Sequence, residues 1–318
     1  MSRFRKFMME WNRVILGSVL TAGSLAELFG FCAPETVFLR EYKYLLTLKE
    51  MEEPYPLTPK LEEARNEVFK DLIRKGRLSQ KQLEKIDIII NGDMNDPFHK
   101  GNLNSRFGTF VALPITFTYN HPEEVPMDNF MIGQTLPIED GTQEGAVLKK
   151  SIIQGKNAVK YALLRECLLT DSYDMQIKYV LLTMFLAICS ALVYLSVTRI
   201  KSRSQMLLTI LPSIPINGLV LLQFWCLYKR RKDSSVDMEV AEFGPDYVLG
   251  GLEYYTQIVR RNKALYYIMK DNTRDHFTAA GNEKEYFFWN DRIPVKTKRD
   301  FFKQKVEEMN DAIKEKIQ

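Results

Sequence analysis

Two long uncharged stretches near the middle of the chain constrain its fold more than any other feature. Residues 179–197 and 206–228 carry no charged side chain, and only the eight residues 198–205 separate them. A membrane-spanning helix needs about 20 mostly apolar residues to cross roughly 30 Å of hydrocarbon. We therefore predict a membrane helical hairpin over residues 177–228, with spans at 177–198 and 206–228. The chain before the hairpin and the chain after it then lie on the same side of the membrane.

The composition excludes several classes of function. The 318 residues include 44 basic and 40 acidic side chains, which gives a formal net charge of +4. This balance is too mild for a nucleic-acid-binding surface, so no nucleic acid partner is expected. The four cysteines are widely spaced, which fits neither a disulfide framework nor a zinc motif. Three histidines are too few for a histidine-rich metal site.

The N-terminus has the composition of a mitochondrial import signal. Residues 1–13 hold four basic residues and one acidic residue, with apolar residues at helical spacing. An amphipathic, basic and acid-poor start is typical of such signals. The same residues also fit a basic flank to the next segment, residues 14–33, which we predict to be a third transmembrane helix. Glu27 in this segment would cost about 2–3 kcal/mol at the centre of a membrane.

Two segments flank the hairpin, residues 34–176 and 229–318, and both have the patterns of a soluble body. Strands are expected at 86–90 and 107–117, and Pro114 should confine the second strand to a sheet edge or a bulge. The predicted fold class is therefore mainly α with a small β element (α+β). The helix predicted at 298–318 is expected to be a solvated amphipathic one. Apolar periodicity predicts helices at 61–73, 146–170, 236–243, 247–269 and 298–318.

One arrangement around the hairpin has the layout of an active site. The segment Tyr161–Leu169 precedes the hairpin on a helix, and Ser235–Asp237 follows it. This layout resembles the membrane zinc metallopeptidases of the CAAX prenyl-protease type, in which an HExxH helix precedes a membrane hairpin and a third ligand follows it. In such a motif, two histidines four residues apart bind zinc from one helical face and the glutamate acts as general base.

The residues at the matching positions do not form that zinc site. Arg165 and Leu169 stand at the histidine positions, and Ser235 stands at the third ligand. Glu166 and Asp237 remain. We therefore predict a degenerate metallopeptidase-like body that is not an enzyme and holds no metal or cofactor. Two alternatives stay open: a membrane zinc metallopeptidase with an unorthodox ligand set, and ordinary polar helix residues near a membrane.

Arg165 suggests what takes the place of the metal. Its guanidinium carries a permanent positive charge and forms strong hydrogen bonds to carboxylates. We expect it to pair with Glu166 or Asp237. Such a pair would hold the helix before the hairpin to the helix after it.

A closer resemblance is spread over about residues 100–302. The segments that carry it are Asn120–Pro122, Ala162–Glu166, Gly250–Tyr255, Asn262–Leu265, Gly281–Asn282, Ile293–Pro294 and Thr297–Asp300. By these segments the chain resembles the transmembrane protein 177 family. The resemblance implies a multi-pass protein of the mitochondrial inner membrane that acts as a non-enzymatic assembly factor for cytochrome c oxidase. It also implies two partners, subunit II of the oxidase and the dedicated membrane chaperone of that subunit, which the factor stabilises during maturation.

Four further residues are candidates for structural or partner contacts. Gly250 and Gly251 belong to one of the segments that carry the resemblance. Pro212 and Pro215 interrupt the second span, where proline removes backbone hydrogen bonds and is expected to kink the helix. Together with Gly218, the two prolines form either a notch for a partner helix or a surface that packs against other spans of the same chain.

Overall fold

The computed structural model describes residues 33–92, 96–125, 142–200, 202–268, 276–284 and 290–317, together with residues 18, 22 and 23. The predicted arm at 1–13 lies outside the described residues, as does nearly all of the predicted span at 14–33. Within the described residues, most elements are helices and five are short strands. The predicted fold class, mainly α with a small β element, is confirmed.

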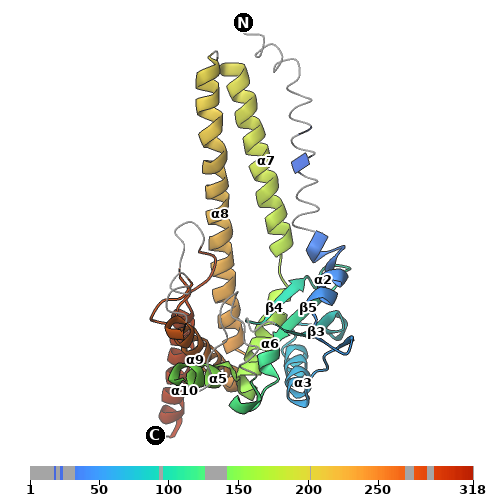
Figure 1. Ribbon diagram of the computed structural model, residues 1–318, viewed down its shortest axis with the longest axis vertical. Coiled ribbons are helices and arrows are strands. Elements are labelled where there is room, and N and C mark those ends of the chain that lie inside the picture. The colour runs from blue at the N-terminus through green and yellow to red at the C-terminus, as the bar shows by residue number, and fades with distance from the viewer. Residues whose placement is uncertain are drawn as a thin grey trace. The chain divides into compact units, whose positions relative to one another are not determined.

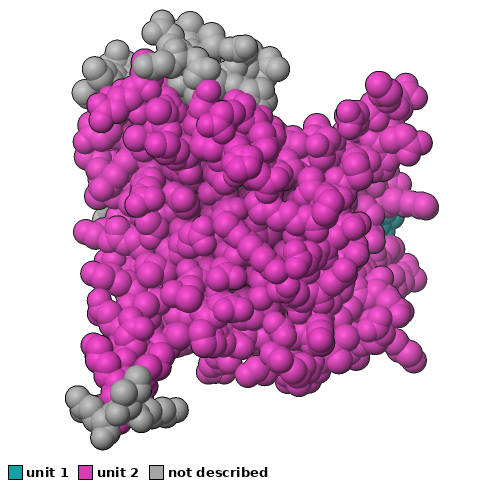
Figure 2. Space-filling model, turned by 90° about the horizontal axis from the view of Figure 1, so that it is seen from below, with its two compact units in different colours: residues 1–39, 172–231, 286–291 teal, residues 40–171, 232–285, 292–318 magenta. Residues whose placement is uncertain are grey.

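The chain divides into two compact units, which Figure 2 colours separately. Unit 1 comprises residues 1–39, 172–231 and 286–291. Unit 2 comprises residues 40–171, 232–285 and 292–318, so segments far apart in the sequence fold together in it.

Unit 1 contains two long helices that run side by side (Figure 1). Helix α7 spans Asp174–Arg199, and helix α8 starts at Arg203 and ends at Ala241. The segments Asp174–Ser196 and Leu208–Ala241 are long and apolar enough to cross a membrane, and few of their residues are buried within the protein. The two predicted apolar helices of the hairpin are therefore present.

Helix α8 is longer than the sequence patterns predicted. Separate helices were expected at 206–228 and 236–243, but one continuous helix covers both and ends at Ala241. The reason is local, because residues 219–241 contain no glycine or proline that would end a helix. Its last ten residues, 232–241, belong to unit 2.

A three-stranded sheet lies at one side of unit 2. Strand β3 (Ile86–Asn91) pairs in parallel with β5 (Thr109–Pro114), and β4 (Phe98–Gly101) pairs antiparallel with the other side of β5. The edge position predicted for the second strand is wrong, because β5 is the central strand and is buried along its whole length. Pro114 is tolerated there because it is the last residue of the strand, beyond the pairing with β4, which ends at Ala112.

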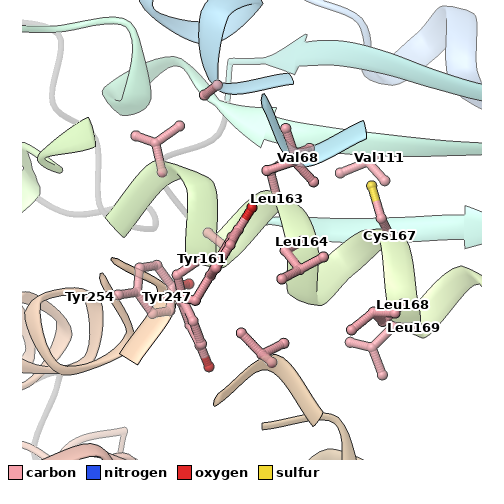
Figure 3. Packing of buried hydrophobic residues seen from close by; sticks show 14 of the residues in the cluster. Val68, Val111, Tyr161, Leu163, Leu164, Cys167, Leu168, Leu169, Tyr247 and Tyr254 are labelled. Atoms are coloured by element: carbon pink, nitrogen blue, oxygen red, sulfur yellow. The ribbon is translucent and has the colours of Figure 1, made fainter. Parts of the chain in front are cut away.

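Helix α6 (Lys156–Thr170) is the core of unit 2. Twelve of its 15 residues are buried, as expected for a helix that is covered on all sides. Figure 3 shows Cys167 of this helix pointing toward Val111 of β5, while Tyr161 points toward Tyr254. The helices around it are α3 (Pro59–Arg74), α5 (Gln143–Ile152), α9 (Pro245–Ile268) and α10 (Val295–Ile317). The remaining elements are short: η2 (Ala33–Glu35), α2 (Leu39–Leu46), β1 (Lys49–Glu50), β2 (Glu53–Pro54), α4 (Gln80–Leu83), η3 (Ile115–Phe117) and η4 (Pro122–Glu124).

Two predicted helices need correction. The helix expected at 146–170 is divided into α5 and α6, because Ile153 is extended and Gly155 starts a new helix as its N-cap. The carboxylate of Glu253 accepts a hydrogen bond from the Gly155 backbone N–H over 3.0 Å, which stabilises this helix start. The helix at 298–318, expected to be a solvated amphipathic one, buries Phe302 completely, so α10 is part of the body of unit 2.

Candidate functional site

Arg165 stands at the centre of a group of carboxylates in unit 2. Its Nε donates to Asp237 Oδ1 over 2.9 Å, and its Nη1 donates to Glu166 Oε1 over 2.7 Å. Its Nη2 donates to Asp233 Oδ1. The structure therefore brings together Arg165, Glu166 and Asp237, and it adds Asp233, which lies one turn before Asp237 on α8. The pair expected between the helices before and after the hairpin is present.

A lysine reaches the same carboxylates from α10. Lys298 Nζ lies 2.5 Å from Asp233 Oδ2 and 3.9 Å from Asp237 Oδ2. On the α6 side, Nδ1 of His99 lies 2.8 Å from Glu166 Oε2. We call these six residues the carboxylate cluster: His99, Arg165, Glu166, Asp233, Asp237 and Lys298.

Tyrosines close the cluster on the side of the core. The Tyr161 hydroxyl donates to Asp237 Oδ1 over 2.7 Å and lies 2.8 Å from the Tyr255 hydroxyl. Lys298 also lies over the ring of Tyr255, with its Nζ 5.4 Å from the ring centroid. Burial and then the charge of Asp237 raise the pKa of Tyr161 well above its ordinary value, so this hydroxyl stays a neutral donor.

The cluster is nearly charge-balanced and mostly shielded from solvent. It holds three acids, one arginine and one lysine, and Asp237 and Glu166 have side chains only 5% and 6% exposed. Burial alone would raise the pKa of Glu166, but the contact with His99 and the charge of Arg165 outweigh burial and lower it. Likewise, burial opposes ionisation of Asp233, but the charges of Arg165 and Lys298 hold its pKa below the usual range. These carboxylates are therefore ionised partners of fixed cations.

The lowered pKa values predict sensitivity to acid. Unfolded carboxyl groups take up protons at about pH 4, whereas Glu166 and Asp233 stay ionised to lower pH in the folded chain. Their contribution to stability is therefore present above that pH and is lost as the pH falls through the folded pKa values. Replacing Glu166 with glutamine should lower the thermal midpoint at about pH 7, and the difference from wild type should shrink toward about pH 3. A difference that stays constant over this pH range would contradict the assignment.

The cluster does not fit the zinc ion that the metallopeptidase resemblance implies. The positive charges of Arg165 and Lys298 already lie among its carboxylates, and a dication would be repelled by both. At the other two matching positions, Leu169 is buried in the apolar core and Ser235 is exposed. In the part of the chain that the structure describes, no group of three or more His, Cys, Asp or Glu side chains is placed to hold a metal ion. We derive no catalytic step through zinc.

Gly250 and Gly251 lie where α9 packs tightly against its neighbours. A Cβ atom on Gly250 would overlap the backbone carbonyl oxygen of Asn157, at the start of α6. A Cβ atom on Gly251 would lie 2.7 Å from the ring of Phe302 in α10. Both glycines therefore serve helix packing within unit 2.

Pro212 and Pro215 belong to unit 1 and are not part of the carboxylate cluster. Both are exposed on α8, within a helix that continues through them. Gly218 has a different environment, because a Cβ atom on it would lie 3.8 Å from the Phe185 ring of α7. The structure thus separates the predicted notch into a glycine that faces α7 and two exposed prolines.

Sequence reasoning missed three members of the cluster. Asp233 had a usable signal, since it lies four residues before Asp237 and so shares its helical face. His99 had none, because it comes from a short strand that only the tertiary fold brings to α6. Lys298 lies in the segment Thr297–Asp300 that carries the family resemblance, but nothing in that segment indicated a contact with α6.

Comparison with known proteins identifies one family. A family model described as Transmembrane protein 177 matches residues 42–315. The match includes both apolar helices and all six residues of the carboxylate cluster. No curated protein and no solved structure matches the chain.

Proposed function

Because the chain belongs to the transmembrane protein 177 family, we propose that it is a non-enzymatic assembly factor of the mitochondrial inner membrane. It is a multi-pass protein that crosses the membrane through α7 and α8. Its partners are subunit II of cytochrome c oxidase and the dedicated membrane chaperone of that subunit. By binding them, it stabilises both during maturation of the oxidase.

The ends of the apolar helices support the membrane part of the proposal. Lys178 and Lys229 lie over the ring of Trp225, with Nζ atoms 5.6 and 5.7 Å from its centroid. Tryptophan and lysine are typical of the boundary between lipid and water. At the other end of α7, Arg199 lies about 31 Å along the helix from Lys178, which is the thickness of the hydrocarbon.

The position of Arg165 is the observation that supports the proposal that the chain is not an enzyme. A catalytic zinc site needs an open metal position and a free general base. Here the guanidinium of Arg165 holds α6 to α8 through Asp237 and also binds Glu166, so the matching glutamate is engaged by Arg165 and His99. Unit 2 thus has the chemistry of a rigid body that supports binding.

Affinity capture from solubilised mitochondria tests this function. We expect the tagged full-length chain to capture subunit II and its chaperone, and deletion of the gene to lower the level of both. Carbonate extraction should leave the chain in the membrane pellet. Capture that lacks both partners, together with unchanged levels after deletion, would rule the proposal out. Stoichiometric zinc in the purified protein would instead favour the metallopeptidase alternative.

A further inference from the structure

One face of α8 within unit 1 is exposed in the part of the chain that the structure describes. The half-buried positions Ile210, Ser213, Asn217 and Leu221 lie on one side of the helix. The opposite side is exposed at helical spacing. Five exposed residues on this side lie close together along the helix: Leu208, Leu211, Pro212, Pro215 and Leu219. We call these five residues the proline face.

The proline face carries backbone acceptors as well as apolar side chains. In an α-helix, each carbonyl accepts a hydrogen bond from the N–H four residues later. Proline has no N–H, so Pro212 leaves the carbonyl of Leu208 without this donor, and Pro215 does the same for Leu211. Both leucines are strongly exposed, at 73% and 66%.

The hydroxyl groups nearby do not replace these donors. Thr209 Oγ1 donates to the carbonyl of Gln205 over 2.8 Å, and Ser213 Oγ donates to that of Ile210 over 2.8 Å. Leu211 lies about 12 Å along the helix from Arg203, where α8 begins, so its carbonyl is within the hydrocarbon if α8 spans the membrane. A backbone carbonyl without a donor is costly there.

We propose that the proline face binds a transmembrane helix of the partner that presents hydroxyl or amide donors to the carbonyls of Leu208 and Leu211. This inference rests on the proposed function and specifies the chemistry of its partner. Serine, threonine, asparagine and glutamine side chains supply such donors between membrane helices. A second copy of this chain cannot satisfy the carbonyls through the same face, because none of its five side chains has a donor.

Restoring the missing N–H groups provides the test. The double variant Pro212→Ala/Pro215→Ala gives both carbonyls their donors back, and it should fold at least as stably as wild type because proline disfavours a helix interior. We expect it to capture the subunit II chaperone about tenfold less well, which is the loss of two interhelical hydrogen bonds of average strength. Leu219→Trp should block the same face sterically. Met184→Trp, at an exposed position of α7, is the matched control and should capture normally.

A second measurement does not depend on the identity of the partner. Fluorescence energy transfer in liposomes would compare the full chain with an all-leucine transmembrane peptide and with the same peptide carrying serines at different depths. Wild type should prefer a serine peptide about tenfold, and the proline double variant should lose this preference. Equal binding of both peptides by wild type, as expected if only lipid covers the face, would overturn the inference. If wild type captures the chaperone and the double variant captures it equally, the inference fails while the proposed function stands. If wild type captures neither partner, the proposed function fails.

Discussion

Replacing Arg165 with methionine should destabilise the protein by about 3–5 kcal/mol, the usual cost of removing one partner from a buried ion pair. Methionine fills a similar volume but leaves Lys298 as the one lysine or arginine in the carboxylate cluster, beside Glu166, Asp233 and Asp237. Three carboxylates in a shielded site then repel one another and lose hydrogen bonds to three guanidinium nitrogens. Pulse proteolysis of the full chain in detergent measures the free energy of unfolding.

Two further arginine variants serve as comparisons for this loss of stability. Arg260→Met, at an exposed position of α9, should change the stability by about 0.5 kcal/mol or less. Arg165→Lys should recover only part of the stability, because one ammonium cannot hold three carboxylates in the geometry of the guanidinium. A methionine variant as stable as wild type would show that the cluster is not held by its central charge.

A double-mutant cycle separates the contact between helices from the rest of the cluster. Arg165→Met and Asp237→Asn should each be destabilising, and the double variant should cost less than their sum by about 0.5–3 kcal/mol. Asp237 also accepts a hydrogen bond from Tyr161, and asparagine retains an acceptor for it. Additive losses would mean that Arg165 and Asp237 do not support one another.

The sequence was most informative where one physical signal decided the structure. Uncharged length predicted α7 and α8, and helical periodicity predicted α3 and α9 to within a few residues. The Arg165–Asp237 pair followed from topology, because an antiparallel hairpin brings the helix before it close to the helix after it. The ends of helices and strands were harder to predict, because the signals for them in the sequence are weaker. Gly155 alone separates two helices that share apolar periodicity, and Pro114 indicated an edge strand although it only ends a central one.

Long-range contacts explain what the sequence did not predict. Lys298 lies 133 positions after Arg165 in a helix whose lysines and glutamates suggested solvent exposure. Its role depends on Phe302, one turn later, which anchors α10 against Gly251 of α9. No local pattern distinguishes Lys298 from the exposed Lys303, because the difference is the tertiary environment.

Gly250→Ala is the other substitution expected to have a large effect, with a loss of about 3 kcal/mol or more in the free energy of unfolding. Two contributions oppose each other. Alanine favours a helix interior over glycine by about 1 kcal/mol. The added Cβ, however, overlaps the carbonyl oxygen of Asn157, and a backbone atom cannot rotate away as a side chain does. Helix α6 would have to move from α9, and overpacking of this kind costs more than the propensity gain.

The same change at other helical glycines provides the controls. In Gly251→Ala the obstacle is the Phe302 ring, so the milder variant Phe302→Leu should relieve part of the loss in the double variant. Gly218→Ala meets Phe185 at 3.8 Å, an ordinary contact, and should be neutral or stabilising. The Gly250 variant has no such rescue by a side chain, because its obstacle is the backbone of α6. If Gly250→Ala proved as stable as Gly218→Ala, the close approach of α6 and α9 would be disproved, and with it the geometry that presents Arg165 to the carboxylates of α8.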